Sequence, residues 1–262
     1  MKIATWNINS VRLRAGLVNK LTQEEAPDIL CLQETKVQDA DFPYDQLRFM
    51  GYEYIIFRGE KSYNGVAILS KIPLANVEKH EIAGSKDTRH ISALLPDGTA
   101  IHNFYIPAGG DEPDININPK YKFKLDFVDY MNEWFGKTIN ANDKAIIVGD
   151  FNIAPMEHDV WSSKQLKNVV SHTEPEITRL NKLKESLNWV DAARHFVSED
   201  EKLYSWWSYR NRDWKKSNRG RRLDHIWTTP ALKESLKSHK VIASARDWEK
   251  PSDHAPVIVE LF

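Results

Sequence analysis

Apolar residues along the chain fall into short runs separated by polar turns that contain Gly and Pro. Ile29 to Gln33 and Ala145 to Val148 are almost continuously apolar, which is typical of strands buried on both faces. Two pairs of runs flank the turn residues Ser62 to Gly65 and Pro96 to Gly98, and these predict hairpins. The predicted strands are residues 2–8, 29–33, 52–58, 66–70, 91–95, 99–106, 145–148, 223–228 and 257–261.

Three other segments space their apolar residues by three and four positions, the period of an amphipathic helix. The first begins near Val11 and ends before Pro27. The second follows Pro119 and ends at Gly136, and the third covers Ile177 to Leu187. These helices predict crossover connections between the strands.

Hairpins mixed with crossover helices argue against a purely parallel sheet. We therefore expect an α/β fold in which two mixed sheets pack face to face with helices outside. No internal repeat or low-complexity linker divides the sequence, and the last predicted strand runs almost to Phe262. We expect one domain over residues 1–262.

The composition, 41% hydrophobic and 28% charged residues in 262, is that of a globular protein and excludes a disordered chain. No apolar run approaches the roughly 18 residues of a membrane span. Met1 to Asn7 reads as a strand and lacks the apolar core of a signal peptide. Cys31 is the single cysteine, so no internal disulfide can form. We expect a cytoplasmic protein without membrane contact.

The formal charge is −1 at pH 7, which by itself does not indicate a nucleic-acid partner. The distribution changes this picture, because Ser205 to Leu223 contains seven cations and one acid, Asp213. A basic surface on an acidic body is typical of a metal-dependent phosphodiesterase, in which carboxylates hold the cation. The cations are Arg210, Arg212, Lys215, Lys216, Arg219, Arg221 and Arg222, interleaved with Trp206, Trp207, Tyr209 and Trp214.

Polar residues recur where the predicted strands end or begin, which core packing does not require. Singly, each fits an ordinary turn or cap, since Gly, Asp and Asn favour turns. Together they predict carboxylates gathered at one edge of the sandwich, which would repel each other unless a cation joined them. Oxygen ligands without extra His or Cys favour Mg²⁺ or Mn²⁺ over Zn²⁺. The set is Asn7, Asn9, Glu34, Asp150, Asn152, Asp224, His225, Asp253 and His254.

Five segments resemble the exonuclease III family, the bacterial apurinic/apyrimidinic (AP) endonucleases of the endonuclease/exonuclease/phosphatase superfamily. They are Trp6-Asn7-Ile8-Asn9, Leu32-Gln33-Glu34-Thr35-Lys36, Gly149-Asp150-Phe151-Asn152, Arg222-Leu223-Asp224-His225-Ile226 and Ser252-Asp253-His254-Ala255-Pro256-Val257. The resemblance spans nearly the whole chain, and the second and fifth segments are specific in combination. It implies a four-layer α/β sandwich like that of deoxyribonuclease I, in agreement with the strand and helix pattern.

Two segments favour the DNA-repair branch of this superfamily, which also contains sphingomyelinases and inositol polyphosphate phosphatases. Leu203 to Arg210 resembles the aromatic segment that lines the family's pocket for the base-free sugar, and Arg221 to Asp224 resembles the segment before a family strand. A phosphomonoesterase or phospholipid phosphodiesterase with the same fold is one alternative, which the Trp-rich basic segment disfavours. A DNA-binding module without catalysis is another, which the filled catalytic positions disfavour.

The resemblance implies a Mg²⁺-dependent phosphodiesterase of base-excision repair that cleaves duplex DNA 5′ to abasic sites and trims 3′ ends as a 3′–5′ exonuclease. Glu34 is the expected main Mg²⁺ ligand, with Asn7 and Asp253 close by, and Mn²⁺ can substitute. The expected partner is double-stranded DNA with abasic sites or 3′ ends, and the enzyme is expected to act as a monomer.

The catalytic roles also follow from the resemblance. Asp150 is expected to orient or deprotonate the attacking water, and Asn152 to hold the water or the phosphate. His254, paired with Asp224, is expected to contact the scissile phosphate. Tyr105 is expected near the phosphate or the leaving oxygen. The choice of general base between Asp150 and His254 stays open.

The DNA surface is expected to centre on Trp206, with Trp207 in the core. Its cations are expected to be Arg12, Arg210, Arg219, Arg221 and Arg222. The loop after Pro107 departs from the family, because Ala108 carries no side-chain amide and Asp111 to Asp114 is acidic. This departure bears on the balance between AP-site cleavage and exonuclease activity.

Overall fold

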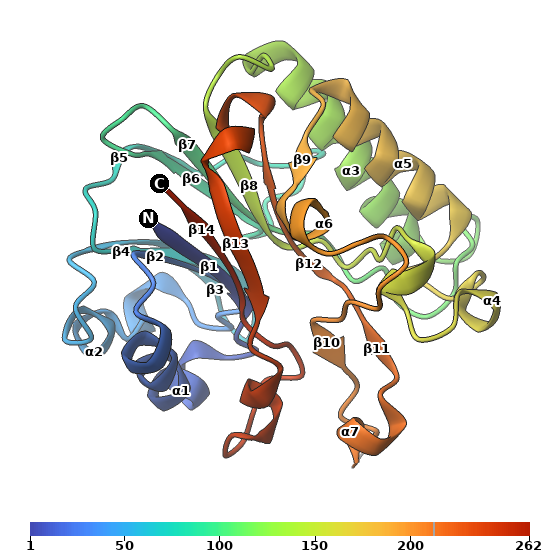
Figure 1. Cartoon of the computed structure of the whole chain (residues 1–262), viewed down its shortest axis with the longest axis horizontal. Helices are drawn as coiled ribbons and strands as arrows, with labels where there is room; N and C mark the ends of the chain where they lie inside the picture. The colour runs from blue at the N-terminus through green and yellow to red at the C-terminus, as the bar shows by residue number, and fades with distance from the viewer. Residues whose placement is uncertain (212) are drawn as a thin grey trace.

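The structure is a computed structural model that describes residues 1–211 and 213–262; Arg212, one of the seven cations of the basic run, lies outside the described residues. Two six-stranded sheets form its centre (Figure 1). From edge to edge, the first sheet contains β13 (Leu236–Val241), β14 (Val257–Leu261), β1 (Lys2–Asn7), β2 (Ile29–Gln33), β4 (Tyr63–Ser70) and β3 (Tyr54–Glu60). The second contains β5 (Ala75–Glu78), β6 (His90–Leu94), β7 (Ala100–Tyr105), β8 (Ala145–Asp150), β12 (Asp224–Thr228) and β9 (Val190–Asp191).

Both sheets are mixed, as the sequence pattern predicts. β1 and β2 are parallel, as are β7 and β8, whereas the other neighbouring strands are antiparallel. A separate two-stranded ribbon, β10 (Trp206–Trp207) with β11 (Gly220–Arg221), projects from the body together with α7 (Trp214–Ser217) (Figure 1).

Alternation of apolar side chains along each strand builds the layers. On β8, Ile146 and Val148 point into the core shared by the two sheets, whereas Ala145 and Ile147 face the helices. α1 (Val11–Glu25) and α2 (Tyr44–Arg48) pack on the outer face of the first sheet, and α3 (Pro119–Thr138) and α5 (Glu174–Ser186) cover the second (Figure 1). Each fully buried Leu, Ile or Phe contributes roughly 1.5–3 kcal/mol. The expected four-layer α/β sandwich is therefore confirmed.

The remaining helices are short. They are α4 (Ser163–Leu166), α6 (Ala192–Phe196) and the 3₁₀ turns η1 (Asp39–Asp41), η2 (Glu157–Asp159), η3 (Pro230–Ser235) and η4 (Ala243–Asp247). Within residues 1–211 and 213–262, none of the helices combines the length and the apolar character needed to cross a bilayer.

Some boundaries differ from the sequence prediction for local reasons. α3 continues two residues past Gly136. α5 begins before Ile177, because Thr173 and Glu176 form a capping box and Pro175 suits the first turn. β4 includes Tyr63 to Gly65, which were expected in the turn. β13 was not predicted, since its sequence Leu-Lys-Ser-His-Lys-Val is mostly polar and half-exposed.

Strand register sets the positions of the polar residues at one edge of the sandwich. Tyr105 lies opposite Asp150 across the parallel pair β7 and β8, and Asp150 lies opposite Asp224 across the antiparallel pair β8 and β12. In the other sheet, Asn7 pairs with Gln33, so Glu34 follows directly. Each sheet thus brings one row of polar residues to the same edge of the sandwich.

Gly149 allows this close approach next to Asp150. Its φ is +142°, and a Cβ there would lie 1.9 Å from the backbone oxygen of Phe104. Only glycine therefore lets β8 pass β7 at this point.

Candidate active site

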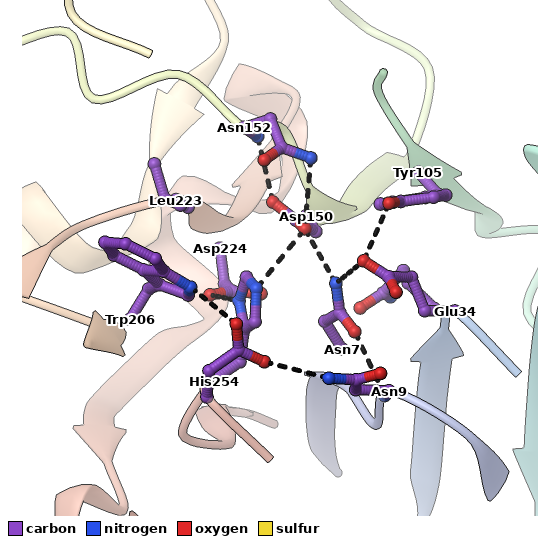
Figure 2. A network of polar contacts seen from close by, with 12 residues as sticks. Asn7, Asn9, Glu34, Tyr105, Asp150, Asn152, Trp206, Leu223, Asp224 and His254 are labelled. Carbon is purple, nitrogen blue, oxygen red and sulfur yellow. Dashed lines mark hydrogen bonds and ion pairs between the residues drawn. The ribbon is translucent and has the colours of Figure 1, made fainter. Parts of the chain in front are cut away.

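Asp150 is the centre of a buried polar network that draws on both sheets (Figure 2). Its Oδ2 accepts the side-chain amide of Asn7 at 2.8 Å and that of Asn152 at 3.2 Å, and it lies 3.6 Å from Nε2 of His254. Its Oδ1 accepts the backbone N–H of Asn152 at 2.9 Å. The expected pair Asp150 and Asn152 is therefore a single hydrogen-bonded unit.

His254 lies between two carboxylates. Its Nδ1 is 2.8 Å from Oδ2 of Asp224, and its Nε2 faces Asp150. The hydroxyl of Ser205 donates to the same Asp224 oxygen at 2.6 Å. Asp224 therefore fixes the orientation of the imidazole, and Ser205 in turn holds Asp224.

Glu34 occupies the more open side of the network. Its Oε1 accepts from Nδ2 of Asn7 at 3.0 Å and from the hydroxyl of Tyr105 at 2.7 Å (Figure 2). Its Oε2 lies 2.6 Å from Nζ of Lys36. Asn7 thus bridges Glu34 and Asp150, and the Tyr105 hydroxyl is directed at Glu34.

Two expected metal ligands play different roles in this arrangement. The Oδ1 of Asn7 accepts the backbone N–H of Asn9 at 3.1 Å, which fixes the amide so that its nitrogen faces both carboxylates. Asp253 accepts from Nδ2 of Asn9 at 3.3 Å and from the indole of Trp206 at 2.9 Å. In this orientation the Asn7 amide nitrogen faces Glu34 and Asp150, and Asp253 is tied to Trp206. That Asn7 and Asp253 lie close to the metal stays a prediction.

The donor set fits a hard divalent cation. Within the described residues, ligand atoms of Asp150, Asp224 and His254 lie within 4.8 Å of one another. His254 and Asp224 already satisfy each other, whereas Glu34 keeps an accessible carboxylate beside the unit. Carboxylate oxygens are the preferred ligands of Mg²⁺ and Ca²⁺.

Burial and charge shift the pKa values of these groups. Burial raises the pKa of Asp150 above its usual range, and the nearby charges of Asp224 and Glu34 add to this. Although burial opposes it, the carboxylates of Asp224 and Asp150 raise the pKa of His254 well above 6.5. Burial, followed by the charge of Glu34, raises the pKa of Tyr105. The surrounding carboxylates therefore favour the protonated form of His254, and burial favours the neutral hydroxyl of Tyr105.

A cavity of about 610 Å³ opens beside this network. The network residues Glu34, Asn152, Asp253 and His254 line it. Trp206 stands in its wall and Trp207 is buried, as the sequence predicts. Trp161, Leu166, Val169 and Leu223 complete an apolar side. A second cavity of about 710 Å³ shares Glu34, Ala108 and Gly110 with the first and is also lined by Tyr105 and by the cations Lys36, Arg89 and Lys120.

The cations of the basic run divide between this cavity and the interior. Arg210 and Arg219 are exposed at its rim, and Arg219 stacks on Trp161 at 4.7 Å. Arg221 lies 5.3 Å above the Trp206 ring and donates to the Ser171 hydroxyl. Arg12 is exposed on the first turn of α1.

The expectation that Arg222 binds DNA is wrong. Its side chain is only 1% exposed and pairs with Asp159 at 2.7 Å and with Asp191 at 2.8 Å. Next to Arg221 on the chain, it points to the opposite side of the backbone. Its guanidinium therefore cannot reach a duplex.

The acidic loop lies beside the site. Ala108, Gly110 and Asp111 line the cavity, so this part of the loop does not turn away. Asp114 instead accepts the backbone N–H of Asn116 within the loop. Asp111 thus places a negative charge in the same cavity as the arginines.

The contacts of several contributors to the network carry no sequence signal, although Asn9 belongs to the polar set that the sequence predicts. Lys36 and Ser205 lie inside the motifs that resemble the family, but only the folded chain places them on Glu34 and Asp224. Asn9 links Asn7, Asp253 and Lys36 from a left-handed backbone conformation, with φ of 47°. Trp161 lies far from the basic run in sequence and joins it only in space.

Comparisons with known proteins agree with this geometry. Residues 4–254 match the Endonuclease/Exonuclease/phosphatase family. Exodeoxyribonuclease III of Haemophilus influenzae is 29% identical over 279 residues, which cover 99% of this chain and 99% of that protein. The solved structure of an AP endonuclease from Archaeoglobus fulgidus has a TM-score of 0.93 at 34% identity, covering 100% of this chain and 99% of its own. The 3′ phosphatase NExo from Neisseria, solved with a product DNA hairpin, has a TM-score of 0.91 at 32% identity. The match covers 100% of this chain and 99% of that chain.

The family match covers most of the chain, and the similar structures cover all of it. These findings confirm the resemblance inferred from the motifs. The nucleases of this family depend on a metal, which agrees with the carboxylate donors of the site. The chain belongs to the endonuclease/exonuclease/phosphatase family and is a DNA-cleaving hydrolase of the exonuclease III type.

Proposed function

We propose that this enzyme hydrolyses duplex DNA on the 5′ side of an abasic site, leaving a 3′-hydroxyl and a 5′-deoxyribose phosphate, and that it also trims 3′ ends. The observation that carries the proposal is the buried Asp150, held by Asn7 and Asn152 against the His254–Asp224 pair. Next to it, a cavity combines tryptophan side chains with arginines. The arrangement provides a general base, a cationic hydrogen-bond donor for the phosphate and a pocket in one place.

Mg²⁺ is the proposed cofactor, with Mn²⁺ able to substitute. Glu34 would hold it, because this carboxylate is partly exposed whereas Asp150 and Asp224 are buried, and Asp253 lines the same cavity. The ion would neutralise charge on the phosphate and lower the barrier to attack on phosphorus. Asn7 orients the Glu34 carboxylate for this purpose.

The proposed division of labour follows from protonation states. A protonated imidazole cannot accept a proton, so His254 serves as a donor to a phosphate oxygen. Asp150, with its pKa raised by burial, accepts the proton of the attacking water, and Asn152 positions that water or the phosphate. The Tyr105 hydroxyl, whose proton is retained, is available to the phosphate or the leaving oxygen.

Recognition of an abasic nucleotide is proposed to rest on the apolar wall. A nucleotide without a base has no stacking to lose, so turning it out of the duplex costs little. Trp206 and Leu223 would pack against the exposed sugar, while Arg210 and Arg219 contact phosphates. The arginines supply affinity, and the pocket supplies selectivity.

The whole chain, residues 1–262, is proposed to form one catalytic domain that acts as a monomer in the cytoplasm. The core shared by the two sheets supports a single domain. The free, buried Cys31 is compatible with a reducing compartment.

A 3′-phosphatase on DNA ends is the second candidate function. The comparably close likeness to NExo, which is named for this activity, favours it. A duplex with a 3′-phosphate at a nick would separate the two, because phosphate release without strand cleavage at an abasic analogue would make the phosphatase the main activity.

The substitution Asp150→Asn tests the proposal. It should lower the turnover of an abasic duplex by roughly 10²- to 10⁴-fold, because the water loses its base. The dissociation constant for the duplex should change little. Asp126→Asn, an exposed carboxylate on α3, is the matched control and should behave like the wild type. Near-normal turnover by Asp150→Asn would break the assignment.

A further inference from the structure

One fully buried cation beneath the site has no part in the chemistry described above. Lys124 lies on α3, and none of its side-chain surface is exposed. Burying an ammonium group is costly unless it is paired and hydrogen-bonded. The groups that contact the ammonium of Lys124 therefore indicate the role of this residue.

Lys124 joins two loops that line the cavity. Its Nζ donates to the backbone oxygen of Asn152 at 2.7 Å and to that of Ala108 at 3.2 Å. Asn152 presents its amide to Asp150, and Ala108 lines the cavity. The two carbonyls come from the segments that directly follow β8 and β7. The ammonium therefore connects the loops that leave these two neighbouring strands.

The carboxylate that pairs with Lys124 connects it to a third segment, around Ser171 and Thr173. Lys124 pairs with Glu176, whose side chain is also fully buried. The same carboxylate accepts the backbone N–H groups of Ser171 and Thr173, at 2.9 and 3.0 Å. Ser171 in turn accepts from Arg221 at 2.6 Å. The pair thus reaches the arginine that stacks on Trp206.

The backbone around Lys124 is fitted closely to it. Gly109 has φ of +90°, and a Cβ there would lie 2.9 Å from Cδ of Lys124 and 3.0 Å from Cγ1 of Val170. Asn152 also adopts a left-handed conformation, with φ of 53°. Such conformations persist when their surroundings hold them, and the Lys124 ammonium holds the carbonyl of Asn152.

Stability alone gives no reason for this arrangement. A buried ion pair is often no more stabilising than apolar side chains of the same volume. What apolar side chains cannot do is hold two backbone carbonyls at fixed points. The ammonium supplies those donors.

We propose that Lys124, paired with Glu176, is a positioning residue that sets the Asn152 and Ala108 loops around the catalytic carboxylate. The inference rests on the proposed function, in which Asn152 and Asp150 act on the attacking water. Lys124 contacts no reacting atom and acts through the backbone of its neighbours.

The double variant Lys124→Met/Glu176→Gln separates this role from stability. It removes both charges together, and the Gln oxygen can still accept from Ser171 and Thr173. Its unfolding midpoint should stay close to that of the wild type. Its kcat on an abasic duplex should fall about 10- to 100-fold, the effect of a displacement near 1 Å, with KM changed little. Lys122→Met, an exposed lysine two positions away, is the matched control and should keep the wild-type kcat.

A readout independent of substrate keeps this test separate from the proposed function. The side-chain amide signals of Asn152 in a ¹⁵N–¹H correlation spectrum should shift in the double variant and stay in place in Lys122→Met. A wild type that leaves the abasic duplex intact would count against the proposed function, while these signals would still decide the inference. Unchanged Asn152 signals, or a wild-type kcat in a folded double variant, would overturn the role of Lys124.

Gly109→Ala is the second test if the double variant does not fold. The added methyl group would press on Lys124 and Val170 without removing either charge. A fall in kcat of similar size with shifted Asn152 signals would support the proposal. A folded Gly109→Ala protein with wild-type kcat and unshifted signals would contradict it.

Discussion

Arg221 and Arg222 are adjacent in the chain but have opposite surroundings. Arg221 lies against Trp206 at the cavity, whereas Arg222 is enclosed by Asp159 and Asp191. Burial would raise the pKa of Asp191, but the charge of Arg222 outweighs it and lowers this pKa to about 2. Charge type and position along the chain predicted both arginines at the DNA surface, whereas the structure leaves only Arg221 at the cavity.

Replacing Arg222 should therefore affect stability far more than replacing an exposed cation. Arg222→Met leaves the buried Asp191 without its arginine partner and Asp159 with Arg194 alone, and it should lower the unfolding free energy by roughly 3–5 kcal/mol. Arg219→Met, at an exposed position, should change it by less than about 1 kcal/mol. Urea denaturation of both variants measures the difference. Equal stability of the two would mean that the Arg222 network contributes nothing.

At the scale of elements, periodicity predicted the long helices and the buried strands because their apolar side chains face a core. It missed β13 and the two-residue strands β10 and β11, whose pairing depends on partners far away in sequence. These short strands carry the basic run outward from the body (Figure 1). The element that positions the cations was therefore not predictable from local pattern.

The projecting ribbon should account for part of the salt dependence of DNA binding. The double variant Arg210→Gln/Arg219→Gln should weaken binding and reduce the slope of log K against log salt by about 0.9 for each phosphate that it no longer neutralises. Lys137→Gln/Lys144→Gln, at exposed positions away from the cavity, should leave the slope unchanged. Fluorescence anisotropy over a range of salt concentrations gives both slopes. A slope that is the same in both variants would exclude the ribbon from the DNA surface.

At the scale of the whole molecule, the sequence identified the residue types of the site and their order, since they stand at strand ends in recognisable motifs. It could not determine which atoms meet. The direction of the Asn7 amide, the contact of Lys36 with Glu34 and the support of Asp224 by Ser205 all depend on packing between the two sheets. Ser205 and Asp224 are 19 positions apart in the chain. Lys36 follows Glu34 by only two positions, but this spacing alone does not determine that their side chains meet.

The buried network around Asp150, together with a divalent cation, is proposed to cleave DNA beside an abasic site. The decisive experiment uses an end-labelled duplex with one abasic-site analogue, incubated with Mg²⁺ or with EDTA and resolved to single nucleotides. The expected product ends 5′ to the lesion and forms only with Mg²⁺. An intact duplex in Mg²⁺, or equal cleavage in EDTA, would contradict this function.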